Sequence, residues 1–299
     1  MRFRSAFTMI ELIFVIVIMG VIGKFGVEFL ARAYESFIYS TTNNKLQARS
    51  ATAVEFIASR LQHRIKDSVI VRQKMKSNAF TALTSANTAT EYLVLEWIST
   101  DIEGYRGATA PFWSGILDID AGIALGNNTL VSPGTDTAAL NLQINTLSYG
   151  TSGINNAALY FIGANSDINA YGWNGVALTQ TGVVHPIKSV AGQATQFTSS
   201  NAATFNGIDV YEYFKLSWTA NAIVITKNAN DMNTLTFYYN YQPWNGMKWY
   251  DGGNIKSAVL MEDVSTFQAM AIGSIIKIQV CAKSDLIEEY SLCKEKTIY

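Results

Sequence analysis

Charged residues, histidine and cysteine are scarce in this chain. Only 15% of its 299 residues are charged, and it has two histidines and two cysteines. With His63 and His185 the only imidazoles, and proline directly after His185, no Ser-His-Asp or Cys-His grouping can be argued, so nucleophilic catalysis lacks a base. The formal net charge of −1 gives no long-range field for nucleic acid. We predict that the chain is not an enzyme, uses no cofactor and binds no nucleic acid.

Proline is absent between residues 7 and 76, so nothing interrupts a helix there. The segment opens with FTMIELIFVIVIMGVIG, residues 7–23, a nearly uninterrupted apolar run with one carboxylate, Glu11. An acid at membrane depth costs about 2.5–3.5 kcal/mol on insertion scales, so it is retained where a partner cation or a functional role offsets that cost. Here only another copy can supply the cation.

The apolar run is too short to cross a bilayer without the residues that follow it. At about 1.5 Å per residue, residues 7–22 cover about 24 Å, against a hydrocarbon core near 30 Å. The span must therefore continue to Leu30. Arg2 and Arg4 hold the N-terminus in the cytoplasm. We predict a transmembrane helix at residues 7–30, with everything after it exported.

The same segment resembles the N-terminus of the type IV pilin superfamily, which comprises pilins, pseudopilins of type II secretion and competence pilins. In that family a prepilin peptidase cuts before a Phe in a pattern like G/A-FTLIEL. The matching positions are Ala6, Phe7 and Glu11, followed by Leu12 and Gly20. The resemblance implies cleavage between Ala6 and Phe7 and N-methylation of Phe7. It also implies that Glu11 and Gly20 serve assembly, with Glu11 paired to the Phe7 amine of a neighbouring subunit.

An ordinary signal anchor or a cleaved secretory signal is the alternative interpretation of this segment. An ordinary apolar signal region has no use for an acid at that place. No small-residue cleavage site of the A-x-A type follows Gly20.

The resemblance also implies an architecture, partners and a location. The fold is expected to be α+β, a long N-terminal helix packed on the antiparallel sheet of a head. Expected partners are other pilin or pseudopilin subunits, the prepilin peptidase, an inner-membrane assembly platform and lipid before assembly. The chain is expected in the bacterial inner membrane as a single-pass protein and then in a periplasmic or cell-surface filament. Its length and the lack of a proline near Glu28 favour a minor subunit.

After the six-residue leader and the membrane helix, the pattern predicts an amphipathic half-helix at residues 31–76. Its apolar stripe has helical spacing and comprises Val54, Ile57, Leu61, Ile65 and Val69. Basic side chains crowd the predicted helix end, where they suit the helix dipole: Arg60, His63, Arg64, Lys66, Arg72, Lys74 and Lys76.

Residues 77–299 are predicted to form a β-rich head. A Gly/Asn/Thr-rich segment at about 122–206 is expected as an insertion, with disorder as the competing description. Period-two alternation and turn residues predict strands at 92–98, 158–162, 182–184, 235–241, 247–250, 255–261, 264–270, 274–282 and 287–298. The apolar spacing of the last strands is similar to that of J-type pseudopilins and W-type minor pilins.

Two pairs of residues in the head are candidate sites. Cys281 and Cys293 lie within one predicted hairpin, where an oxidising periplasm favours a disulfide over a metal site; two thiols on opposite faces are the alternative. Asp118 and Asp120 form a DxDxG fragment that is a weak candidate for Ca²⁺, because no further acid follows for fifteen residues. A polar turn is the alternative, and we predict no metal site.

Three functions follow from these observations. The first is a minor pilin that initiates or caps a type IV filament, and the second is a minor pseudopilin that drives protein export. The third is a pilin-anchored adhesin that binds glycans through aromatic side chains, for which the candidates are Trp113, Trp173, Trp244 and Trp249. Core packing is the alternative role for these tryptophans.

Overall fold

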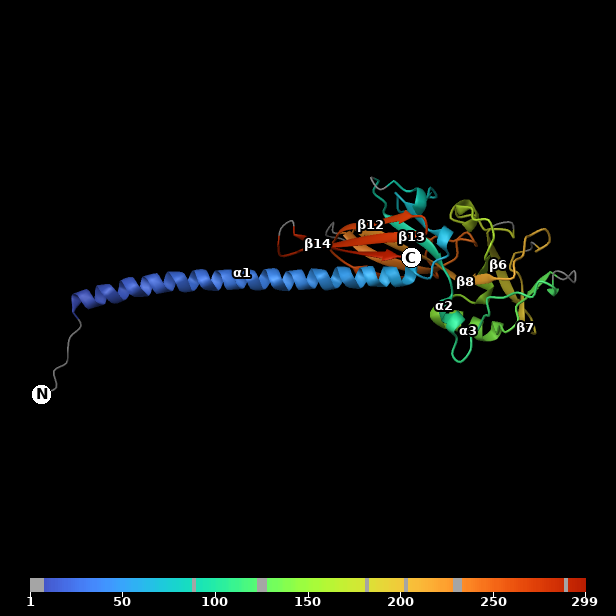
Figure 1. The fold of residues 1–299 in the computed structure, drawn as a ribbon, viewed down its shortest axis with the longest axis horizontal. Helices are drawn as coiled ribbons and strands as arrows, with labels where there is room; N and C mark the ends of the chain where they lie inside the picture. Colours follow the sequence, from blue (N-terminus) through green and yellow to red (C-terminus); the bar gives the residue numbers. More distant parts are fainter. Residues whose placement is uncertain are drawn as a thin grey trace.

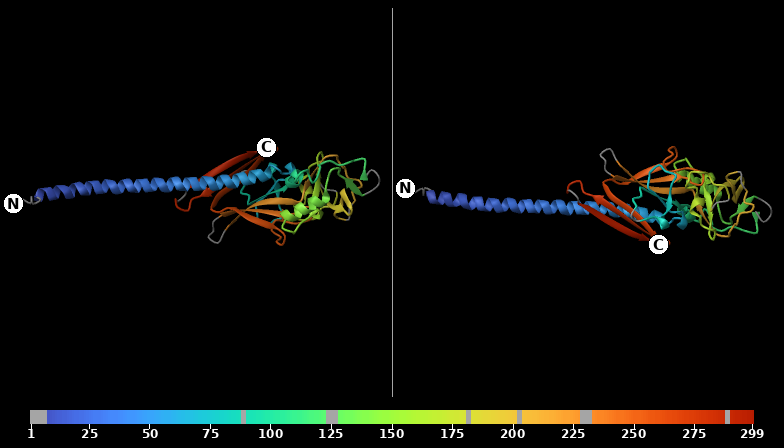
Figure 2. Two further views of the ribbon diagram at one scale, coloured as in Figure 1. Left: turned by 90° about the horizontal axis from the view of Figure 1, so that it is seen from below. Right: turned by 90° about the horizontal axis from the view of Figure 1, so that it is seen from above.

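The computed structural model describes residues 8–87, 90–122, 128–180, 183–201, 204–227, 233–287 and 290–299. In these residues a 53-residue helix, α1 (Met9–Leu61), projects from a head built on antiparallel sheets (Figure 1). The views in Figure 2 agree that the first half of α1 extends away from the head and that its second half lies along it. The predicted α+β class, with a helix packed on antiparallel sheet, is confirmed.

Helix α1 ends at Leu61, well before the predicted end at residue 76. Val54, Ile57 and Leu61 form the buried stripe as expected, but the stripe does not continue as helix. The chain turns at Gln62 and enters strand β1 (Ile70–Arg72). Three consecutive β-branched residues, 69–71, favour a strand there, and Ile70, Val71 and Arg72 pair with β3 (Val94–Ser99).

A six-stranded antiparallel sheet forms the centre of the head, in the order β11-β10-β9-β3-β1-β2. One face, with Leu95 and Trp97, packs against α1, and the other, with Val94 and Ile98, packs against loops of the head. Both faces are therefore apolar. The remaining strands of this sheet are β2 (Thr81–Ala82), β9 (Thr219–Lys227), β10 (Asn233–Tyr241) and β11 (Lys256–Met261).

A three-stranded C-terminal sheet, β12 (Val264–Ile272), β13 (Ile275–Lys283) and β14 (Ser291–Ile298), lies along the second half of α1 (Figure 1). Ile278, Val280 and Ala282 of β13 share one core with α1. Ion pairs reinforce this packing: Lys45 with Asp285 at 3.4 Å, Arg49 with Asp263 at 3.3 Å, and Lys296 with Glu55.

A second, five-stranded sheet lies beyond the C-terminal end of α1, with strand order β4-β7-β6-β5-β8 (Figures 1 and 2). Its core contains Leu140 and Ile144 of α3 and Phe197 and Phe214 of the sheet. The described residues of the predicted 122–206 insertion are thus packed rather than unstructured, and the unit continues into β8. Its elements are α2 (Ile102–Arg106), β4 (Thr129–Val131), α3 (Thr137–Leu147), β5 (Ala158–Phe161), β6 (Val184–Val190), β7 (Gln193–Ser199) and β8 (Phe214–Ser217).

Most predicted strands are confirmed to within a few residues, whereas the predicted strand at 247–250 is wrong. There the carboxylate of Asp251 accepts a hydrogen bond from the Lys248 amide at 2.8 Å, which closes a turn. The predicted strand at 182–184 begins at Val184, and residue 182 lies outside the described residues. Short 3₁₀ helices complete the fold: η1 (Lys66–Ser68), η2 (Leu83–Ser85), η4 (Ile154–Asn156) and η5 (Ile168–Tyr171).

Asn240 joins the central sheet to the second sheet. It has a positive φ of 64° at a bulge in β10 and is fully buried. Its side chain accepts a hydrogen bond from Ser152 at 2.6 Å and donates to Thr151 at 2.7 Å, both in the loop after α3. The bulge moves Tyr241 to the opposite face of the sheet from Phe237, which the simple alternation did not predict.

Candidate assembly surface on the N-terminal helix

The first half of α1 exposes a continuous apolar surface. Between Met9 and Leu30 its large apolar side chains are 45–84% exposed. The helix is long and apolar enough to span a membrane. An apolar surface of this size requires lipid or other apolar helices around it. The helix is therefore consistent with the predicted membrane anchor.

Glu11 has a role within its own chain. Its Oε2 accepts hydrogen bonds from the backbone amide of Thr8 at 3.2 Å and from the Thr8 hydroxyl at 3.1 Å. Thr8 is the N-cap residue of α1, so Glu11 occupies the third helical position of a capping box. Among the described residues, Oε1 of Glu11 accepts no hydrogen bond. The carboxylate is held at the helix start with one oxygen directed to local bonds.

Other predicted assembly residues lie at or near this helix end. Ala6 and Phe7, the predicted processing and N-methylation residues, and the rest of the leader lie outside the described residues. Gly20 lies on the exposed surface, and a Cβ added there would meet no atom within 4 Å. The protomer itself therefore gives no packing reason for glycine at this position. Close approach of a second helix is the usual reason for a small residue on such a face.

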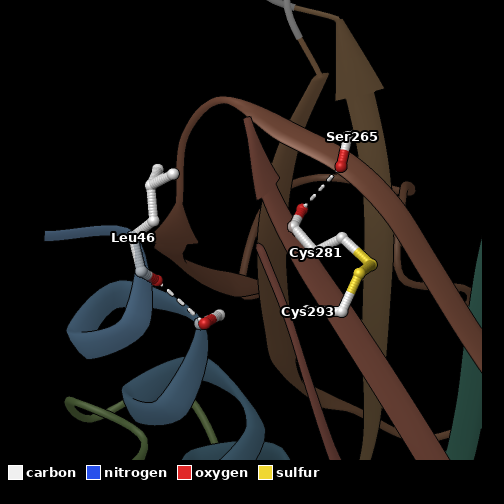
Figure 3. The surroundings of a disulfide bond; sticks show 5 residues. Leu46, Ser265, Cys281 and Cys293 are labelled. Carbon is white, nitrogen blue, oxygen red and sulfur yellow. Dashed lines mark hydrogen bonds between the residues drawn. A yellow bond between two sulfur atoms is a disulfide. The ribbon is translucent and has the colours of Figure 1, made fainter. Parts of the chain in front are cut away.

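Cys281 and Cys293 form a disulfide between β13 and β14 (Figure 3). They are directly paired residues of the two antiparallel strands. Because side chains alternate along a strand, the disulfide lies on the face opposite to Val280 and Ala282, which pack toward α1. It thus joins the two strands that carry the docking surface for the helix.

Asp118 and Asp120 form a polar turn. Oδ1 of Asp118 accepts a hydrogen bond from the Asp120 amide at 3.1 Å, and the Asp118 amide bonds to Val131. In the described part of the chain no third His, Cys, Asp or Glu joins them in a group that could hold a metal ion.

The four tryptophans proposed as a glycan-binding patch are core residues, which contradicts that role. Their exposed fractions are 0–5%. Trp113 belongs to the core of the second sheet, whereas the other three lie on the face of the central sheet that is opposite to α1. Core packing, the alternative role of these four tryptophans, is confirmed, and they do not converge on one surface.

A buried ion pair crosses strands β1 and β3, and sequence reasoning missed it. Nε of Arg72 donates to Oε1 of Glu96 at 2.5 Å, and the hydroxyl of Tyr241 donates to Oε2 at 2.9 Å. Arg72 also donates to the carbonyls of Ser77 and Trp173 at 2.8 and 2.9 Å. Burial raises the pKa of Glu96, and Arg72 and Tyr241 oppose that rise.

The predicted basic cluster at the helix end is therefore wrong in composition. Arg72 belongs to the buried pair, and Arg64 is buried and donates to the carbonyls of Leu61 and Ser274. Arg60 remains at the last turn of α1, where it pairs with Glu103 at 3.3 Å. The sequence signal for the buried Arg72–Glu96 pair was Glu96 itself, the single carboxylate in the apolar run YLVLEWI, because a buried charge requires a partner.

Asp101 is buried where the central and second sheets meet. Its Oδ1 caps α2 by accepting from the Gly104 amide at 3.2 Å and accepts from Gln143 at 3.2 Å. Its Oδ2 and Oε1 of Gln143 are both buried without a hydrogen-bond partner. Burial raises the pKa of Asp101 from 3.8 to about 6, which places its titration in an accessible range. The carboxyl faces the interior and links α2 to α3 through these bonds.

We expect Asp101→Asn to change how stability depends on pH. Because the pKa of Asp101 is higher in the folded state, protonation of its carboxyl adds to the free energy of unfolding. This contribution is fully present below pH 3.8 and is lost as the pH rises through 6. The advantage of wild type over the variant should therefore shrink by about 2 kcal/mol between pH 4 and 7. Urea unfolding of the full chain in detergent at both pH values measures it. His185, whose pKa burial lowers to about 4, acts with the opposite sign in both chains and cancels in the comparison. A constant difference would contradict the shifted pKa.

Comparison with protein families, with curated proteins and with solved structures finds no match to this chain. The fold itself defines a class, an α+β protein with an apolar N-terminal helix that can span a membrane and that packs on antiparallel sheet. This architecture is compatible with a pilin-like subunit.

Proposed function

We propose that the chain is a minor subunit of a type IV pilus or pseudopilus filament, made competent by prepilin peptidase cleavage before Phe7. The observation that carries the proposal is an apolar helix with an exposed surface and one carboxylate, Glu11, held by hydrogen bonds at its start. The mechanism is assembly without chemical turnover. Extraction transfers the apolar surface from lipid into a bundle of neighbouring helices, where the same side chains stay out of water.

Cleavage supplies the cation that Glu11 lacks. Removal of the leader would leave an α-amino group on Phe7, next to the Thr8 amide that bonds to Glu11. Oε1 of Glu11 accepts no bond among the described residues, so it can accept from the amine of a neighbouring subunit. In a helix bundle, where water is excluded, a charge-assisted hydrogen bond of this kind is stronger than in water.

A place at the filament tip is supported by the position of the second sheet. This sheet lies beyond the end of α1, at the far side of the head from the N-terminus (Figure 1). A subunit stacked above would have to clear it, and a tip subunit has nothing above it.

The pilus and the secretion pseudopilus give different deletion phenotypes, lost surface fibres in one case and lost exoprotein secretion in the other.

Glu11→Gln is expected to reduce incorporation into filaments while leaving membrane insertion intact. Glutamine still accepts the Thr8 bonds at the third helical position, so the capping box survives and only the charge is lost. We expect crosslinking to neighbouring subunits to fall about tenfold, the equivalent of about 1.4 kcal/mol of pairing energy.

Thr8→Val is the matched control for this experiment. It removes the hydroxyl of the capping box but keeps the carboxylate, and it should assemble nearly as wild type does. Wild-type assembly by Glu11→Gln would exclude the pairing role. Equal loss in both variants would show that the loss is not specific to the charge of Glu11, which would contradict the pairing role.

A further inference from the structure

The exposed half of α1 carries a second charged feature beyond Glu11. Lys24, Glu28, Arg32 and Glu35 alternate in sign at intervals of four, four and three residues. All four are exposed, and among the described residues no ion pair within 4 Å involves any of them. At about 100° per residue they lie within an arc of about 80° on the helix surface. They form one stripe, which we call the charge ladder.

The charge ladder discriminates between possible registers of two parallel helices. With no axial offset, each charged residue faces the same residue of the other copy, so all contacts are between like charges. An offset of eight residues places Lys24 beside Arg32, and an offset of seven places Glu28 beside Glu35, again like with like. At an offset of four residues, Lys24 meets Glu28 and Glu28 meets Arg32, while Arg32 comes within one residue of Glu35.

We propose that a second copy of this chain packs in parallel against the charge ladder, displaced along the helix axis by about four residues, or about 6 Å. The inference rests on the proposed function, since it takes filament neighbours as the occupant of this face. The same offset separates Phe7 from Glu11. One displacement therefore brings together both the Phe7 amine with Glu11 and the opposite charges of the charge ladder. Glu11 lies about 60° around the helix from Arg32.

The physical reason is the cost of charge in a dry bundle. Before assembly, Lys24 lies about 25 Å along the helix from Phe7, near the outer edge of the hydrocarbon core, where its head can reach water. Once neighbouring helices cover the stripe, an unpaired or like-paired charge loses hydration without compensation. A register that joins opposite charges avoids this cost. An offset of four residues joins more of them than an offset of eleven, which pairs Lys24 with Glu35 alone, so the ladder favours a register that the uniform apolar surface leaves open.

Disulfide crosslinking between two differently tagged copies tests the register. Val17 and Val21 lie on the same arc as the charge ladder and are exposed apolar residues. The full chain, with its leader removed by co-expressed prepilin peptidase, is oxidised in native membranes with a membrane-permeant oxidant. We expect Val17→Cys in one copy to crosslink to Val21→Cys in the other about tenfold more than to Val17→Cys, a difference of about 1.4 kcal/mol between registers.

A complete reversal of the charge ladder provides the decisive control. In the reversed chain all four charges change sign: Lys24→Glu, Glu28→Lys, Arg32→Glu and Glu35→Lys. Reversed copies paired with each other should keep the Val17–Val21 crosslink. Reversed copies paired with wild type should instead favour Val17–Val17, because opposite charges then face each other without an offset.

The outcomes separate the register from the proposed function. Dominant Val17–Val17 crosslinking between wild-type copies, or a register unchanged in the mixed pair, would overturn the inference and leave assembly standing. No crosslink at either pair, in membranes that contain both chains, would overturn self-association and with it this inference, and would leave unlike subunits as the neighbours in the proposed filament.

Discussion

Glu96→Gln is expected to lower the free energy of unfolding of the head by about 3–5 kcal/mol. The change removes the negative charge but keeps the size of the side chain. Arg72, of which only 3% of the side chain is exposed, is then left as an uncompensated buried cation. Its other bonds, to two backbone carbonyls, do not neutralise the charge. Chemical denaturation of the full chain in detergent, followed by tryptophan fluorescence, measures the loss.

The chain offers a matched control in Glu103→Gln. Glu103 pairs with Arg60 at 3.3 Å, but the two side chains are 44% and 46% exposed. Solvent screening limits such a pair to less than about 1 kcal/mol. A loss at Glu96 no larger than that at Glu103 would show that the Arg72–Glu96 pair does not hold the head together.

A double-mutant cycle isolates the pair itself. Arg72→Met removes the cation, and in its presence Glu96→Gln should cost less than in wild type by about 1–3 kcal/mol. Strict additivity would mean that the two side chains do not interact.

Ala6→Lys is expected to abolish maturation of the chain. A protease pocket that accepts a small residue before the cut excludes a long charged side chain, so nearly all of the protein should keep residues 1–6. Coexpression with the prepilin peptidase and measurement of the intact mass shows this directly. Ala6→Gly keeps the position small and should mature at least as well as wild type. Normal maturation of Ala6→Lys would place the cut elsewhere.

The exposed apolar half of α1 was predictable because composition alone determines it. The helix end was not, because Ile65 and Val69 continue the helical spacing past Leu61. They are buried instead on either side of η1, ahead of β1, which pairs with β3. Local pattern and tertiary pairing disagree at this point, and tertiary pairing prevails.

The second sheet was harder to predict than the C-terminal strands. Strand β7 has one large apolar side chain, Phe197, among serine, threonine, glutamine and alanine, so its alternation is weak. In β10 the alternation is strong, yet Asn240 introduces a bulge that no periodic pattern contains. The Arg72–Glu96 pair is diagonal across β1 and β3, so it requires the strand register, which the sequence pattern does not provide.

The candidate assembly surface was the part of the site most accessible from sequence. Glu11 and Gly20 stand out because the surrounding residues are uniformly apolar, and both lie on the exposed helix. The capping bond between Thr8 and Glu11 was not foreseen, although the spacing T-x-x-E is a capping-box pattern. It gives the acid a local role beside the proposed intersubunit one.

The proposed function depends on a new amine at Phe7. The most direct measurement is the mass of the N-terminal peptide of the wild-type chain, purified from native membranes of cells with an active prepilin peptidase. We predict a chain that begins at Phe7 and carries a methyl group on its α-amine. A chain that still begins at Met1 would contradict the account, because Glu11 would then have no terminal amine to meet.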